Sequence, residues 1–135
     1  MRKLCISLLM VVAACATGYA QDDMSQDSAE QLAHLAVSPA KDGIGRAVVE
    51  VVNQDGKTVS NAGITLESKW GGDEFCESFG PSNSKGAIAL PPIHMGDLRL
   101  VVKAKGYETV RMVISREDLA RPIRVSLKKK SGLFG

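Results

Sequence analysis

Residues 85–107 read KGAIALPPIHMGDLRLVVKAKGY, and this stretch decides the fold. A lysine–glycine turn begins it, and a short apolar run follows at 87–90. Two prolines end that run, because proline has no backbone N–H to give to a sheet. After Gly96, residues 98–104 largely alternate apolar and polar side chains, which is typical of a strand with one buried face. The stretch therefore predicts strand, loop, strand and tight turn.

Similar short strands are predicted on both sides of this stretch. Residues 45–52 are rich in β-branched side chains, and turn residues follow at 53–56. Three strands are expected before residue 70, and no long helix is predicted between them. Short strands that are joined by turns favour an antiparallel all-β domain. Further strands are predicted at 108–115 and 123–127.

The first twenty residues have the composition of an export signal. Arg2 and Lys3 form a basic start, and the apolar run after them is too short to span a bilayer stably. Small residues before Gln21 favour ordinary cleavage there. Alternatively, Val-Ala-Ala-Cys ending at Cys15 resembles a lipoprotein box with a lipidated cysteine, and an uncleaved N-terminal helix is a third interpretation. We expect an exported protein, periplasmic or extracellular, that meets a membrane only if Cys15 is lipidated.

The rest of the chain divides into three parts. Residues 21–43 carry five acids and one base, and their apolar face is thin, which predicts a flexible acidic tether. At most a transient helix is expected in it, with Ser25 or Ser28 as the cap. The folded sandwich is expected at 44–128, and a basic, flexible tail at 129–135.

The charges balance once the predicted signal is set aside. The chain has 17 Lys and Arg against 15 Asp and Glu, and Arg2 and Lys3 account for the difference. A neutral domain gives no reason to expect nucleic-acid binding. The lysines at 128–130 are interpreted as part of a solvated tail, since a run of three charges is short.

Residues 70–80, WGGDEFCESFG, hold Trp70, Phe75 and Phe79. A strand period would place the two phenylalanines on one face and Cys76 on the other. Two interpretations stay open. The rings form a contact surface for a sugar, a peptide or a protein, or two of them fill a core that otherwise holds small residues. The second is favoured, because aromatic side chains contribute most to burial.

Cys76 is the single cysteine of the expected folded part, so the domain has no intrachain disulfide. We interpret it as a small buried apolar residue. Pairing with another chain is the alternative for a lone thiol in an exported protein.

The order of these turns and strands resembles carboxypeptidase regulatory-like domains. One block of the resemblance covers 45–66 with its Asp-Gly-Lys turn, and the other covers 85–107 with its Leu-Pro-Pro step and its Ala-x-Gly-Tyr turn. The resemblance extends over about 45–127, which is nearly the whole folded part. Residues 93–95, Ile-His-Met, depart from the family pattern as an insertion before Gly96.

The resemblance implies a seven-stranded antiparallel prealbumin-like sandwich, similar to transthyretin and to collagen-adhesin B-type modules. It also implies a non-catalytic stabilising, spacer or binding role. The isopeptide bond of the adhesin relatives is not expected, because residues 123–127 contain no Asn. The hydrolase relatives' Tyr-Arg-Gly-Ser ending is absent from this sequence as well.

The chain has no HExxH, GxSxG, phosphate-loop or paired CxxC motif. We therefore expect no enzyme, no cofactor and no metal site. The leading hypothesis is a binding or structural module of a bacterial envelope that contacts a protein or a glycan. The alternative is a lipid-anchored spacer, acylated at Cys15, with no specific ligand. The candidate contact residues are Trp70, Phe75, Phe79, His94 and Met95.

Overall fold

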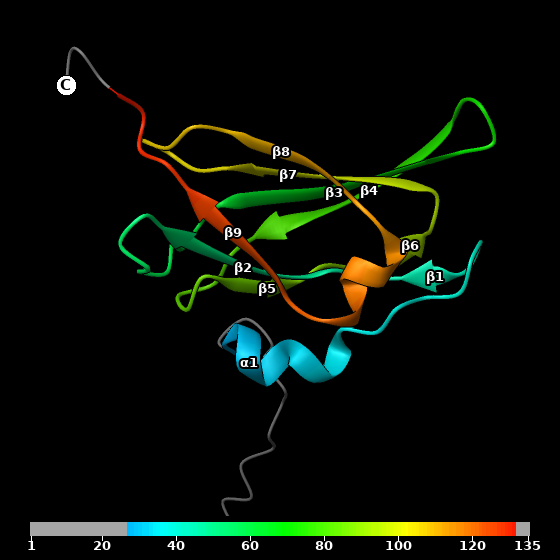
Figure 1. Cartoon of the computed structure of the whole chain (residues 1–135), viewed down its shortest axis with the longest axis horizontal. Coiled ribbons are helices and arrows are strands. Elements are labelled where there is room, and N and C mark those ends of the chain that lie inside the picture. Colours follow the sequence, from blue (N-terminus) through cyan, green and yellow to red (C-terminus); the bar gives the residue numbers. More distant parts are fainter. Residues whose placement is uncertain (1–26, 132–135) are drawn as a thin grey trace, which may run out of the picture.

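Two β-sheets face each other in the computed structural model, which describes residues 27–131 (Figure 1). The all-β sandwich prediction is confirmed. The predicted signal, its cleavage sites and Cys15 lie outside the described residues, as do residues 132–135 at the end of the predicted tail.

The larger sheet has four antiparallel strands in the order β4-β3-β7-β8. β3 and β4 pair without interruption, because every residue of β3 from 63 to 70 has a partner in β4. Inward side chains alternate with outward ones, as the period of two predicts. The bounds are β3 (Gly63–Trp70), β4 (Glu74–Pro81), β7 (Asp97–Lys103) and β8 (Val110–Ile114).

The smaller sheet has the order β5-β2-β9, from β5 (Ala87–Ala89), β2 (Val48–Asn53) and β9 (Ile123–Leu127). β2 and β9 are parallel, which corrects the prediction of a wholly antiparallel sandwich. After β8, the chain leaves the larger sheet through the 3₁₀ turn η3 (Arg116–Ala120). This link turns the chain so that β9 runs alongside β2 in the same direction (Figure 1).

A small third pair joins β1 (Ile44–Gly45) to β6 (Ile93–His94). It raises the number of strands in the described residues to nine, where seven were predicted. The extra pair arises at the Ile-His-Met insertion, which crosses the end of the sandwich and bonds to the chain before β2.

The main core lies between the two sheets. Val49 and Val51 of β2 face Ile64 and Leu66 of β3, and all four side chains are almost completely buried. The scarcity of aromatic residues predicts such an aliphatic core. The other buried members are Ala47, Ala62, Leu90, Met95, Leu98, Leu100, Val102, Ile114, Leu119, Val125 and Leu127.

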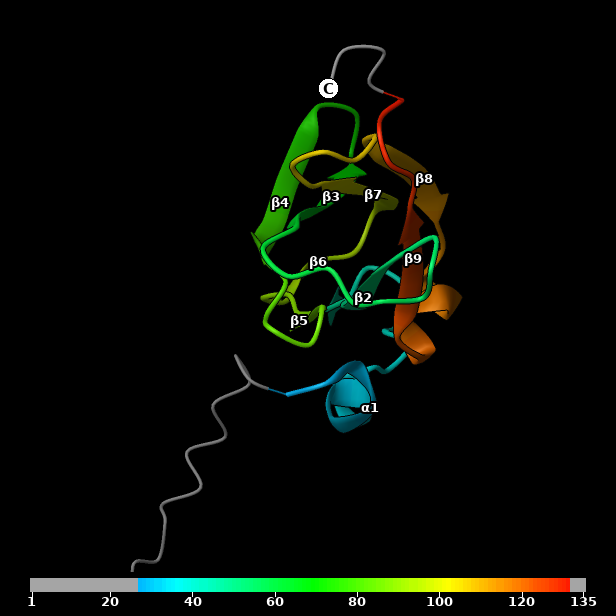
Figure 2. The ribbon, with the colours of Figure 1, turned by 90° about the vertical axis from the view of Figure 1, so that its left-hand side faces the viewer.

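A short helix covers the outer face of the smaller sheet (Figure 2). It consists of α1 (Ala29–Leu32) and η2 (Ala33–Leu35), and Ser28 caps it through a capping box with Gln31. Leu32 is fully buried against Val48, which points away from the main core. This part of the predicted tether is therefore a packed element.

A loop crosses the inner face of the larger sheet between β5 and β7. The Ser68 hydroxyl donates a 2.6 Å hydrogen bond to the carbonyl of His94, and it accepts one of 2.7 Å from the N–H of Gly96. The Ser78 hydroxyl donates to the carbonyl of Pro91. Small polar residues therefore face inward at this end of the sheet, where the loop occupies the space of large side chains.

The chain after β9 stays attached to the turn between β7 and β8. Lys129 forms a β-bridge with Tyr107, and the N–H of Lys130 bonds to the carbonyl of Gly106. The described part of the predicted tail is thus held in place at its start. Among residues 27–131, no helix has the length and apolar character to cross a membrane.

Candidate functional site

The outward face of the larger sheet is the candidate site, and we call it the outer face. One row of neighbouring residues crosses it from Phe75 through Lys69 to Asp97. A second row crosses from Glu77 through Glu67 and Arg99 to Val113. Phe79 begins a third row, next to Thr65. The register of four strands thus brings together side chains from four separate parts of the sequence.

Three large apolar side chains on this face are exposed. Phe79 is 70% exposed, Phe75 is 50% exposed and Val113 is 84% exposed. The two phenylalanines lie on the edge strand β4, whereas Val113 lies on the opposite edge strand β8. No described element covers this face of the sandwich (Figure 2).

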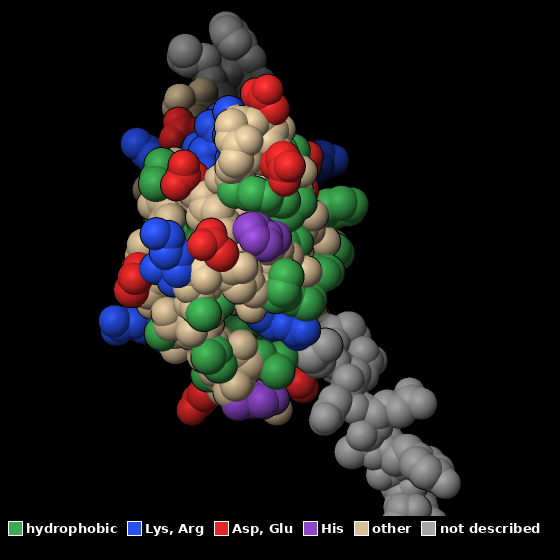
Figure 3. Space-filling view, turned by 90° about the vertical axis from the view of Figure 1, so that its right-hand side faces the viewer, with side chains coloured by type: hydrophobic (Ala, Val, Ile, Leu, Met, Phe, Trp, Pro, Cys, Tyr) green, Lys and Arg blue, Asp and Glu red, His purple; other side chains and the backbone are tan. Residues whose placement is uncertain are grey.

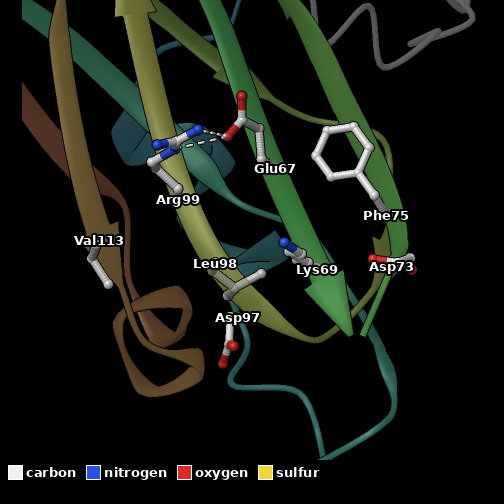
Figure 4. A pocket seen from close by; sticks show the side chains of 8 residues that line it. All are labelled: Glu67, Lys69, Asp73, Phe75, Asp97, Leu98, Arg99 and Val113. Carbon is white, nitrogen blue, oxygen red and sulfur yellow. Dashed lines mark hydrogen bonds and ion pairs between the residues drawn. The ribbon is translucent and has the colours of Figure 1, made fainter. Parts of the chain in front are cut away.

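A shallow depression of about 540 Å³ lies between these apolar margins (Figure 4). In its middle, the Arg99 guanidinium forms a 2.8 Å ion pair with the Glu67 carboxylate across β7 and β3. An exposed pair of this kind contributes at most about 1 kcal/mol to folding, so it serves mainly to orient both side chains. The lining residues are Glu67, Lys69, Asp73, Phe75, Asp97, Leu98, Arg99 and Val113.

The two phenylalanines correct the favoured interpretation of their segment. They do not fill the core, because the inward positions of β4 belong to Cys76, Ser78 and Gly80. The loop that bonds to Ser78 occupies the space beneath them. The predicted alternation is confirmed, with the phenylalanines on one face and Cys76 on the other.

The other predicted contact residues lie elsewhere. The rings of Trp70 and His94 contact each other, with centroids 4.4 Å apart and planes inclined by 45°. Both side chains are half-buried, and Trp70 follows the inward parity of β3. Met95 is 1% exposed and belongs to the main core, so it is not available for contact with a ligand. The five candidates therefore do not form one surface.

His94 is held against the sandwich by its backbone and by its ring. Its carbonyl accepts the hydrogen bond from Ser68, and its ring rests on Trp70. The Nδ1 atom is buried without a hydrogen-bond partner among the described residues. Within residues 27–131, no three His, Cys, Asp or Glu side chains are grouped to hold a metal ion.

Cys76 is half-buried and unpaired in the described part of the chain. Its Sγ atom lies 4.0 Å from the carbonyl oxygen of His94. The thiol therefore lies at the margin of the core, between the two interpretations that its sequence context leaves open.

Several residues of the outer face were not identified from the sequence. Lys69, Glu67, Arg99 and Val113 lie on strands whose alternation is visible, so their outward direction could have been inferred. Their proximity to one another could not, because it depends on the order and register of the strands.

One solved structure with a similar fold is 3-chlorocatechol 1,2-dioxygenase from Rhodococcus opacus 1CP. It matches with a TM-score of 0.51 and 12% sequence identity, over 68% of this chain and 62% of the dioxygenase chain. At this identity, the likeness shows the fold alone. No protein-family model and no curated protein matches the sequence.

This comparison corrects the expectation that the domain is not an enzyme. That expectation depended largely on the resemblance to non-catalytic modules, yet an enzyme has the same kind of sandwich. The fold therefore does not argue against catalysis. The β-sandwich that the family resemblance predicts is confirmed. The family itself is not shown, because no carboxypeptidase regulatory-like model matches.

Proposed function

We propose that this chain is an exported protein-binding module, and that the outer face of its larger sheet is the contact surface. The observation that carries the proposal is the exposure of Phe75 and Phe79 on the same face of β4, on either side of Glu77. Large apolar side chains exposed on one face among polar residues are typical of protein interaction sites. Aromatic side chains are also among the residues that contribute most to binding energy.

A protein partner suits this surface better than a glycan. Phenylalanine rings have no polar atom with which to bond a sugar hydroxyl, and the central guanidinium and carboxylate already pair with each other. Trp70, which has such an atom, is half-buried and rests against His94. Charges of both signs are interspersed on the face of the molecule that Figure 3 shows, so that face does not offer a field of one sign.

The resemblance to carboxypeptidase regulatory-like domains supports this proposal. We assign the sandwich to the carboxypeptidase regulatory-like, prealbumin-like type on the ordered turns of 45–66 and 85–107. Modules of that type carry binding or structural roles. A bacterial envelope remains the expected location, with a lipidated Cys15 as the alternative means of attachment.

Site-specific photo-crosslinking in the producing cell tests the proposal. A photoreactive phenylalanine analogue at position 79 is expected to give one discrete adduct with another protein. The same analogue at position 37 is the matched control, since Val37 is 63% exposed but lies away from the larger sheet. Equal labelling at both positions, an adduct with glycan, or no adduct at position 79 would overturn the proposal.

A further inference from the structure

β4 is an edge strand of the larger sheet, and one of its two edges is free in the described part of the chain. Within residues 27–131 it pairs only with β3, and its eight residues match eight residues of that strand one to one, without a bulge. Edge strands of soluble proteins are commonly protected by short length, bulges, charged side chains (lysine above all) or proline within the strand. β4 has no lysine, its charged residues are Glu74 and Glu77, and its one proline, Pro81, is its last residue.

The free edge presents the backbone of three particular residues. The N–H of Ser82 bonds to the carbonyl of Ala62, so the even-numbered residues of β4 direct their backbone groups toward β3. Phe75, Glu77 and Phe79 therefore direct theirs outward, in the direction where Pro81 also lacks an N–H. Each offers one donor and one acceptor, and their side chains all lie on the outer face.

Glu77 gives this edge a carboxylate that forms no ion pair within residues 27–131. Its cross-strand neighbour on β3 is Glu67, which already pairs with Arg99. A cation arriving at the free edge would thus face an unpaired carboxylate between two exposed aromatic rings.

We propose that β4 accepts an extended segment of the partner protein as a fifth strand of the sheet, and that this segment carries apolar, basic and apolar residues at alternate positions. Main-chain hydrogen bonds would supply affinity, and the side chains opposite Phe75, Glu77 and Phe79 would supply specificity. This inference rests on the proposed function, since it names how the partner docks.

A second copy of this chain is a poorer occupant. If two copies of β4 paired in a register that includes Phe75, Glu77 and Phe79 of both, Glu77 of one copy would lie opposite Glu77 of the other. Like charges that are directly opposite each other destabilise a pair of strands. A heterologous segment with lysine or arginine at that position has no such conflict.

The test uses the peptide Ac-Thr-Val-Thr-Lys-Thr-Val-Thr-NH2 and the chain labelled for NMR. Binding is expected to shift the amides of Phe75, Glu77 and Phe79. Replacing the lysine by glutamate is expected to weaken binding by about 2- to 30-fold, because a favourable cross-strand pair becomes an unfavourable one. The variant Glu77→Lys is expected to reverse the preference between the two peptides.

N-methylation separates strand addition from other docking modes. In an antiparallel fifth strand, a methyl group on the backbone nitrogen of the lysine removes a hydrogen bond to β4 and is expected to abolish binding. On the neighbouring threonine, the same group points away from β4 and is expected to leave binding intact.

Three results would overturn the inference. They are equal binding of both methylated peptides, no preference for lysine over glutamate, and self-association of the chain alone with protection of the same three amides. If any of these occurs while position 79 still crosslinks to one protein in cells, the docking mode is wrong and the proposed function stands.

Discussion

Gly96 shows how one residue fixes the loop against the larger sheet. A Cβ at this position would collide with the backbone carbonyl of Lys69, and its N–H bonds to the hydroxyl of Ser68. Backbone atoms cannot rotate aside as the end of a side chain can. The glycine before β7 is thus required by close packing, in addition to any role in the turn.

Gly96→Ala is therefore expected to destabilise the domain by roughly 1–3 kcal/mol, as overpacked sites do. Chemical denaturation measures this change. Gly63→Ala is the matched control, because the nearest atom to its Cβ is the Lys103 carbonyl at an ordinary 3.6 Å. Equal destabilisation by both substitutions would contradict the close approach at Gly96.

Opposite faces of the larger sheet should respond differently to truncation. Leu66→Ala removes a fully buried side chain and is expected to cost about 2–5 kcal/mol. Phe79→Ser changes an exposed ring and is expected to alter stability by no more than about 0.5 kcal/mol. Denaturation midpoints check both values. A large loss of stability for Phe79→Ser would show that this ring is part of the core.

At the scale of elements, alternation predicts which residues share a face but not which face is inside. In β7 and β9 the larger apolar residues point inward, and the sequence prediction was right. In β4 the rule fails, because the loop at 91–95 occupies the inner side. Ser78 bonds to that loop, and the larger Phe75 and Phe79 are left outside.

Helix α1 and η2 provide a second case. The segment is short and has a thin apolar face, so composition alone favours a tether. The structure shows an apolar surface on which the segment packs, and composition alone does not reveal it. Val48 and Ala87 form an apolar outer face on the smaller sheet, and Leu32 covers it.

Leu32→Ala is accordingly expected to cost about 2–5 kcal/mol, since the side chain is fully buried. Val37→Ala, at a site that is 63% exposed a few residues later, is the control and is expected to be nearly neutral. Thermal unfolding of the two variants makes the comparison. If both variants are neutral, the segment is a tether and does not pack on the sheet.

The turn η3 carries a carboxylate that should depend on pH. Asp118 accepts hydrogen bonds from the backbone N–H of Ser115, at 2.8 Å, and from its hydroxyl, at 3.1 Å. The first of these bonds has the larger effect, and together they hold the pKa of Asp118 below its usual 3.8. The charged form therefore favours folding above pH 3.8, and this contribution is lost as the pH falls toward the lowered pKa.

An NMR titration of the Asp118 side chain is expected to show a midpoint below 3.8. The variant Asp118→Asn keeps an acceptor oxygen but should lose this part of the pH dependence of stability. A midpoint at or above 3.8 would mean that the bonds to Ser115 do not form in solution.

At the scale of the whole molecule, the sandwich could be predicted and its contact surface could not. Turn residues and alternation indicate short strands along 44–128, and the structure places strands there. The outer face depends on strand order, on register and on where the crossing loop lies. None of these is encoded in a local stretch, so Phe75 and Phe79 were found without the Lys69, Glu67, Arg99 and Val113 that accompany them.

Amide hydrogen exchange along β4 in the isolated chain tests the central claim, which is that this strand offers a free edge beside an exposed apolar face. We predict fast exchange at Phe75, Glu77 and Phe79 and slow exchange at Cys76, Ser78 and Gly80, because only the second set bonds to β3. Equal protection of both sets in dilute solution would show that the edge is already covered, and would contradict the account.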